Sequence, residues 1–175
     1  MMNHKAALQM WDLLRQRHGI AMRAIAALPA DKLDSRPIPN MRSPKELVVH
    51  MYDLVIRAIV EGVERGEIFD TEADEQEIAS GIRSRDELLQ YARRSWDAAN
   101  KAMNAMTDTH LANEVKTSWG RNFPGWMALG ITHDEFLHHR GQLYAYVRAL
   151  GAEPPNVWDF KGNEPAYQPR TGAMA

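Results

Sequence analysis

Apolar residues recur every three or four positions along four long stretches of this 175-residue chain, and this repeat constrains the fold more than any other feature. Such spacing puts the apolar side chains on one face of an α-helix, and that face must be buried against another element. We therefore predict an all-α fold, a four-helix bundle that forms one domain over residues 1–175. The predicted helices are 4–28, 44–64, 84–105 and 124–150, followed by a C-terminal tail at 151–175.

Two of the predicted helices begin with the same start signal. Ser43-Pro-Lys-Glu46 and Ser84-Arg-Asp-Glu87 each place a glutamate three residues after a serine. In this capping box the serine hydroxyl accepts a hydrogen bond from the third amide of the helix, and the glutamate reaches back to the serine amide. Proline at the first helical position strengthens the first of the two boundaries.

The segments between the helices lack a clear helical period. Residues 29–43 hold three prolines and are predicted to be a loop. Residues 67–77 are strongly acidic, which is typical of a solvated loop, and residues 107–124 are expected to be extended or irregular. In the tail, Trp158 and Phe160 are the expected anchors onto the bundle.

Composition excludes several classes of protein. The chain has no cysteine, which removes a disulfide framework, a cysteine nucleophile and an iron–sulfur cluster. Its 21 basic and 23 acidic residues are scattered and give a formal charge of −2, so nothing indicates a nucleic-acid surface. There is no signal-peptide run and no stretch near the roughly 18 apolar residues that a membrane helix needs. We expect a cytoplasmic protein that binds neither nucleic acid nor a membrane.

One run in the fourth predicted helix, His133-Asp-Glu-Phe-Leu-His-His-Arg-Gly-Gln-Leu143, carries the candidate chemistry. A helix advances about 100° per residue, so Glu135 and His139 lie about 40° apart and can hold one ion between them. His139 falls at the edge of the buried stripe, and His50 has a similar place on the second helix. Histidines on different helices can meet inside a bundle. The sequence therefore predicts an open metal site formed by His50, Glu135 and His139.

Other interpretations of the histidines remain open. A histidine on an amphipathic helix is more often a hydrogen-bonded boundary residue than a metal ligand. His18, on the apolar stripe of the first helix, is predicted to be structural, and His138 is predicted to face outward. Glu135-x-x-His138 has the spacing of di-iron bundles, but those sites need the motif twice, and no second copy occurs.

Gly141 is unusual, because glycine inside a helix costs about 0.5–1 kcal/mol relative to alanine. We expect it to permit the close approach of another helix, or of a ligand beside His139. Arg140 and Gln142 would then orient a carboxylate or carboxamide of that ligand. Asp53, Arg140 and Tyr146 are available as acid or base, but no spacing assigns that role, so the sequence identifies no catalytic residue.

The chain resembles the DinB (damage-inducible) family of four-helix bundles at two motifs. The family's fourth helix is similar to His138-His-Arg-Gly-Gln-Leu143 and to the Tyr144-Ala-Tyr-Val-Arg-Ala-Leu-Gly151 that follows it, with a Pro-Pro-containing tail after both. The family's second helix is similar to Ser43-Pro-Lys-Glu-Leu-Val-Val-His50. The resemblance implies an up-down-down-up course and a divalent metal, most often nickel or zinc. Its ligands would be His50, the residue at position 135, and His139. Position 135 is Glu here rather than the commoner His, which shifts the preference toward iron or manganese.

The resemblance also implies a function. It indicates a metal-dependent, thiol-dependent S-transferase or hydrolase that acts on a small-molecule substrate, with a low-molecular-weight thiol as partner and a metal-activated nucleophile. A homodimer is implied as well. The absence of cysteine fits an external thiol or a water nucleophile. The alternative is a non-catalytic helical bundle that binds a small molecule or a partner in a stress response, with ten methionines and five tryptophans as core filler.

Overall fold

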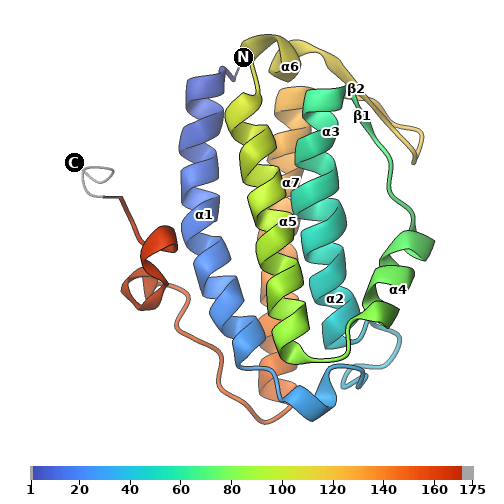
Figure 1. Cartoon of the computed structure of the whole chain (residues 1–175), viewed down its shortest axis with the longest axis vertical. Coiled ribbons are helices and arrows are strands. Elements are labelled where there is room, and N and C mark those ends of the chain that lie inside the picture. The colour runs from blue at the N-terminus through green and yellow to red at the C-terminus, as the bar shows by residue number, and fades with distance from the viewer. Residues whose placement is uncertain (1, 171–175) are drawn as a thin grey trace.

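Four long helical segments lie side by side and form the body of the protein (Figure 1). The computed structural model describes residues 2–170. The first segment is α1 (His4–Ala26), and the second is built from α2 (Pro44–His50), η2 (Met51–Ala58) and α3 (Ile59–Arg65). The other two are α5 (Arg85–Ala105) and α7 (Gly125–Ala149). The fold is therefore mostly helical.

The helix starts follow the capping chemistry of the sequence. Ser43 accepts a hydrogen bond from the amide of Glu46 at 3.2 Å and donates its own amide to the Glu46 carboxylate at 2.7 Å, so this capping box is complete. Ser84 accepts from the amide of Glu87 at 3.2 Å. The Glu87 carboxylate, however, accepts from the amide of Arg83 rather than from Ser84. The second box is thus half formed, which still satisfies one free amide at the start of α5.

The second helical segment changes its winding directly after His50. Met51–Ala58 is π-helical, with hydrogen bonds spanning five residues rather than four. Tyr52 and Ile56 are fully buried there, whereas Leu54, which an α-helical period puts at the centre of the apolar stripe, is only partly buried. π-helical turns are rare and occur frequently at functional sites.

The connections hold more structure than the sequence predicts. The acidic stretch is not a solvated loop, because it contains β1 (Glu67–Ile68) and most of α4 (Glu72–Gly81). After α5 come α6 (Asp108–Ala112), β2 (Glu114–Thr117) and β3 (Phe123–Pro124). The strands form a sheet in the order β1-β2-β3, in which β2 pairs parallel to β1 and antiparallel to β3. This small sheet is a departure from the all-α prediction.

A connected set of buried rings joins the four helical segments at the centre of the core. Trp11 of α1 stacks on Trp96 of α5 at 4.5 Å between ring centroids, and His18 stacks on the same tryptophan at 4.3 Å. His18 meets Tyr52 of η2 edge to face at 5.5 Å, and Tyr52 meets Phe136 of α7 in the same way at 5.9 Å. All five side chains are buried. The rings thereby fix how the helices are turned toward one another.

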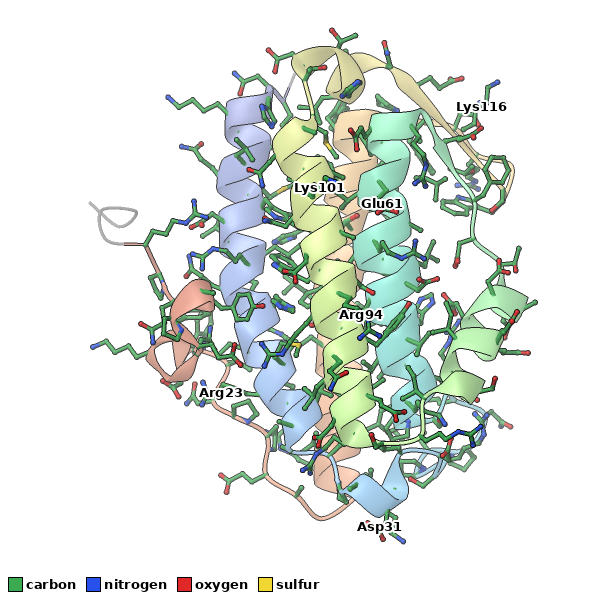
Figure 2. The ribbon with its side chains drawn as sticks, viewed as in Figure 1. Arg23, Asp31, Glu61, Arg94, Lys101 and Lys116 are labelled. Carbon is green, nitrogen blue, oxygen red and sulfur yellow. The ribbon has the colours of Figure 1, made fainter. Side chains whose placement is uncertain are left out.

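The tail after α7 returns along the outer side of α1 (Figure 1). Arg23 of α1 points toward this tail and forms an ion pair with Asp159 at 2.7 Å (Figure 2). Asn163 is buried and donates to the carbonyl oxygen of Gln16 at 2.9 Å. Trp158 is 74 % exposed, so the prediction that it anchors the tail was wrong, whereas Phe160 packs against the core.

Within residues 2–170, the structure has no helix that combines the length and the apolar character needed to cross a membrane.

Two helical glycines allow a test of what close packing contributes. Alanine is favoured over glycine inside a helix by about 0.5–1 kcal/mol. At Gly62 of α3 a Cβ would lie 2.7 Å from the carbonyl oxygen of Glu67 and would also collide with Ile68. At Gly141 of α7 a Cβ would meet nothing within 4 Å, so the expected close approach of another helix was wrong.

We expect Gly62→Ala to lower the free energy of unfolding by about 1–3 kcal/mol, because overpacking against backbone outweighs the gain in helix propensity. Gly141→Ala is the matched control and should raise it by about 0.5–1 kcal/mol. Urea unfolding of both variants checks the two signs. A stabilised Gly62→Ala protein would contradict the tight contact between α3 and β1.

Candidate metal centre

His50 and His139 face each other across the interface between the second helical segment and α7. His50 is the last residue of α2, and His139 lies in the middle of α7. Their ring centroids are 4.7 Å apart and the ring planes are nearly perpendicular, at 88°. His139 is 7 % exposed. The structure thus brings together the two histidines that the sequence places at the edges of two buried stripes.

Glu75 of α4 orients the His50 ring. Its Oε1 lies 2.7 Å from Nδ1 of His50, and Glu75 is only 6 % exposed. An ionised carboxylate only accepts hydrogen bonds, so the proton belongs on Nδ1 and the lone pair on Nε2. The other carboxylate oxygen of Glu75 lies 3.6 Å from the Arg42 guanidinium. His50 is therefore held in the tautomer that leaves a lone pair on Nε2.

Gln142, which lies on α7 as His139 does, orients the His139 ring. Its Oε1 lies 2.8 Å from Nδ1 of His139, and its Nε2 lies 3.0 Å from Nε2 of His138. The amide oxygen is an acceptor, so Nδ1 of His139 carries the proton. Nε2 of His139 is buried and has no hydrogen-bond partner among residues 2–170. A buried imidazole nitrogen left in this way is costly unless it binds something.

Glu135 lies next to this free nitrogen. Its Oε2 is 3.3 Å from Nε2 of His139, and its side chain is about half exposed. Burial lowers the pKa of His139, and the nearby His50 lowers it further, while Gln142 and Glu135 act in the opposite direction. The lowered pKa keeps His139 neutral, which a metal ligand requires.

These residues do not form a ready-made cage. In the described part of the chain, no group of three or more His, Asp or Glu side chains is arranged to hold a metal ion. The donor set still fits a divalent ion, because two imidazole nitrogens and one carboxylate oxygen suit zinc, nickel, iron or manganese. The unpartnered Nε2 of His139 adds to that fit. His50, Glu135 and His139 are therefore the residues that would hold an ion.

Sequence reasoning missed Glu75, because it assigned the acidic stretch to a solvated loop. The signal was present at Thr71-Glu-Ala-Asp74, a capping box that the structure forms at the start of α4. A helix beginning there would have been a candidate for packing against α2. Gln142 was expected to orient a ligand, whereas the structure directs it to His139.

Two of the three residues considered as acid or base, Asp53 and Tyr146, already form other hydrogen bonds. Asp53 is buried and accepts from the Tyr91 hydroxyl at 2.6 Å and from Arg57. Tyr146 donates its hydroxyl to the carbonyl oxygen of Arg42 at 2.5 Å. Burial lowers the pKa of Arg140.

Asp70, which the sequence did not single out, is the titratable carboxyl of this region. Partial burial raises its pKa to about 7, and the negative charges of Glu75 and Asp53 act in the same direction. Asp70 therefore exchanges a proton near neutral pH.

A cavity of about 670 Å³ opens beside the histidine pair. Its walls come from the loop before α2, from α2 itself, from α4 and from α7, and they include Arg42, Glu75, His139 and Gln142. Small-molecule sites in proteins usually have volumes of roughly 300–1,000 Å³. The space is large enough for a small organic molecule that touches His139.

The comparisons with known proteins agree with this fold. The sequence profile of the DinB family matches residues 1–171. A DinB-like protein from Bacillus subtilis has a similar structure, with a TM-score of 0.66 and 19 % sequence identity, over 86 % of this chain and 96 % of that one.

A second solved structure also matches. It is a histidine-to-alanine variant of the mycothiol-dependent maleylpyruvate isomerase, with a TM-score of 0.53 and 14 % identity, over 90 % of this chain and 68 % of that one. No curated protein matches the sequence. At these identities the two solved structures establish a shared fold.

The remaining prediction about histidine concerns His18, which the structure buries completely in the core. Its Nδ1 lies 2.8 Å from the Tyr52 hydroxyl, and burial lowers its pKa well below the usual range, with Arg93 acting in the same direction. The unfolded chain takes up a proton at this histidine below about pH 6.5, and the folded core does not.

The protein should therefore lose stability as the pH falls below about 6.5, with a contribution from His18 of up to roughly 1.4 kcal/mol per pH unit. His18→Phe should keep the stacking on Trp96 and reduce this slope, which urea unfolding at about pH 8 and about pH 5 would measure. The same replacement at the exposed His138 is the control and should leave the slope unchanged. An unchanged slope in His18→Phe would mean that His18 is charged in the folded protein.

Proposed function

The chain belongs to the DinB family, and we propose that it is an enzyme that depends on a divalent metal held by His50, Glu135 and His139. The observation that carries this proposal is the matched orientation of the two histidines. Glu75 and Gln142 each accept from an Nδ1, which leaves both Nε2 atoms as lone-pair donors. Histidines that bind metals almost always donate their other nitrogen to such an acceptor.

Nickel or zinc is the expected metal, since imidazole nitrogens suit both ions. The Glu135 carboxylate also suits iron or manganese. When bound, the ion would lower the pKa of a thiol or a water and so supply a nucleophile near neutral pH.

The residues of the chain itself have three roles in this proposal. Glu75 and Gln142 hold the protons of His50 and His139 on Nδ1. The cavity wall positions a small molecule against His139. Asp70, whose pKa is raised to about 7 by burial, is the carboxyl of this region best suited to exchange a proton near neutral pH.

We propose a thiol-dependent S-transferase or a hydrolase as the reaction class. The chain has no cysteine, so a sulfur nucleophile has to come from a low-molecular-weight thiol. One protein with a similar fold is, by its name, a mycothiol-dependent isomerase. The up-down-down-up course of the helices and a homodimer are part of the same proposal.

A non-catalytic bundle that binds a small molecule or a partner is the second candidate. The observation in its favour is that one ring nitrogen of each histidine already has a hydrogen-bond acceptor, Glu75 for His50 and Gln142 for His139. Such contacts satisfy part of the polar character of the histidine pair without any ion.

Metal binding separates the two candidates. We expect the purified protein to bind one divalent ion per chain at micromolar concentration, and His139→Ala to abolish this binding because it removes the buried free nitrogen. His138→Ala is the control and should bind as the original protein does. Titration with nickel or zinc, followed by mass spectrometry of the native protein, measures both.

Two outcomes decide between the candidates. Absence of metal binding in the original protein would reject the enzyme. Metal-dependent turnover of a thiol conjugate that is lost in His50→Ala would reject the non-catalytic bundle.

Glu75 gives a second and independent test. Glu75→Ala should weaken metal binding about 10–100-fold, the usual effect of removing the acceptor behind a ligand histidine. Glu72→Ala, an exposed change on the same helix, is the matched control for the loss of one negative charge. Equal metal affinity of the two variants would show that Glu75 does not orient His50.

A further inference from the structure

Arg42 differs from the other charged residues around the cavity, because most of its guanidinium donors form no hydrogen bond with residues 2–170. We propose that the cavity binds a small organic acid, whose carboxylate pairs with the Arg42 guanidinium. This inference rests on the proposed function, since it names the substrate class of the same site.

Arg42 and Arg36 are the two cations of the cavity wall, and they differ in what they already bind. The two terminal nitrogens of Arg36 donate to the carbonyl oxygen of Met41 at 2.6 Å and to the Glu46 carboxylate at 2.8 Å. Among residues 2–170, the guanidinium of Arg42 has one contact, the long ion pair with Glu75 at 3.6 Å, and its side chain is 40 % exposed. A guanidinium has five N–H donors in a fork that matches a carboxylate, so Arg42 has donors free for a ligand.

The acidic residues of the wall do not cancel this charge. Glu46 is neutralised by Arg36 and by the amide of Ser43. Glu75 accepts from His50 at 2.7 Å and meets Arg42 only through the longer contact of 3.6 Å, which leaves most of the guanidinium donors unused. Glu72 is exposed, and water screens its charge. The cation that remains available inside the cavity is Arg42.

The backbone that carries Arg42 is firmly held. The Tyr146 hydroxyl donates to its carbonyl oxygen at 2.5 Å, and Tyr146 is fully buried. The next residue, Ser43, is fixed by the capping box of α2. Binding therefore orders little more than the arginine side chain, which keeps the entropic cost of binding low.

The cavity also connects Arg42 with the histidine pair. Both Arg42 and His139 line it, from the loop before α2 and from α7. A molecule that places its carboxylate on Arg42 can thus present another part to His139. This geometry favours a bifunctional acid over an apolar substrate.

The test measures binding of succinate to the metal-free full-length protein by calorimetry at low salt, with succinamide as the neutral analogue of the same shape. Removing the metal ensures that the carboxylate is not simply binding an ion. We expect saturable binding of succinate, no comparable binding of succinamide, and a loss of at least about tenfold in Arg42→Gln, as for other charged hydrogen bonds. Arg42→Lys keeps the charge without the fork and should fall between the two.

Lys101→Gln removes one positive charge from an exposed position on α5 and is the control for net charge (Figure 2). It should bind succinate as the original protein does. Equal binding of succinamide, or unchanged binding in an Arg42→Gln protein that melts at the normal temperature, would overturn the proposal. If Arg42→Gln does not fold, unchanged binding in Arg42→Lys would do so.

Metal titration of Arg42→Gln keeps this inference separate from the proposed function. Normal metal binding with lost succinate binding supports both. Succinate binding through Arg42 in a protein that takes up no metal supports the acid site and rejects the metal enzyme. Metal binding without succinate binding in the original protein rejects the acid site alone.

Discussion

The edge-to-face contact between Tyr52 and Phe136 sets the geometry on which the candidate site depends. Tyr52 follows His50 by two residues, and Phe136 precedes His139 by three, so this contact fixes the register of the second helical segment against α7. Tyr52 is itself tied to α1 through His18, and His18 stacks on Trp96 of α5. Because interiors are close-packed, a shift of any one helix would be transmitted through these rings to the histidine pair.

The orientation of the two histidines comes from different levels of structure. Gln142 is three residues from His139 on the same helix, so ordinary helix geometry brings the amide to the ring. Glu75 reaches His50 only because α4 packs against α2, and its buried carboxylate accepts from the His50 ring and lies 3.6 Å from the Arg42 guanidinium. The pair of His139 and Gln142 therefore forms within one helix, whereas the pair of His50 and Glu75 forms only when the protein folds.

This difference explains what the sequence could and could not predict. Apolar periodicity and capping residues such as Ser43 are local signals. They were sufficient to predict the four long helical segments and the proximity of His50 to His139. The burial of Glu75 could not be predicted in this way, because it depends on the packing of an acidic helix that composition alone assigns to solvent. The π-helical turns after His50 were invisible for a related reason, since a period of 3.6 residues assumes regular α-helical winding. Gly141 led to a wrong prediction of close helix packing, because a glycine in the sequence does not show whether a neighbouring element lies close to it.

The packing of the tail on α1 has a consequence for the order of folding. Asn163 donates to the carbonyl oxygen of Gln16, and Arg15 donates to the carbonyl oxygens of Ala166 and Gln168, so α1 is covered by a segment that follows it by 147 residues or more. Contacts this distant in sequence slow folding, because a long loop must close before they form. During synthesis the outer face of α1 stays uncovered until the residues that bond to Arg15, 151 and 153 positions further along, have emerged from the ribosome. The packing of α1 is therefore completed long after the helix itself has been made.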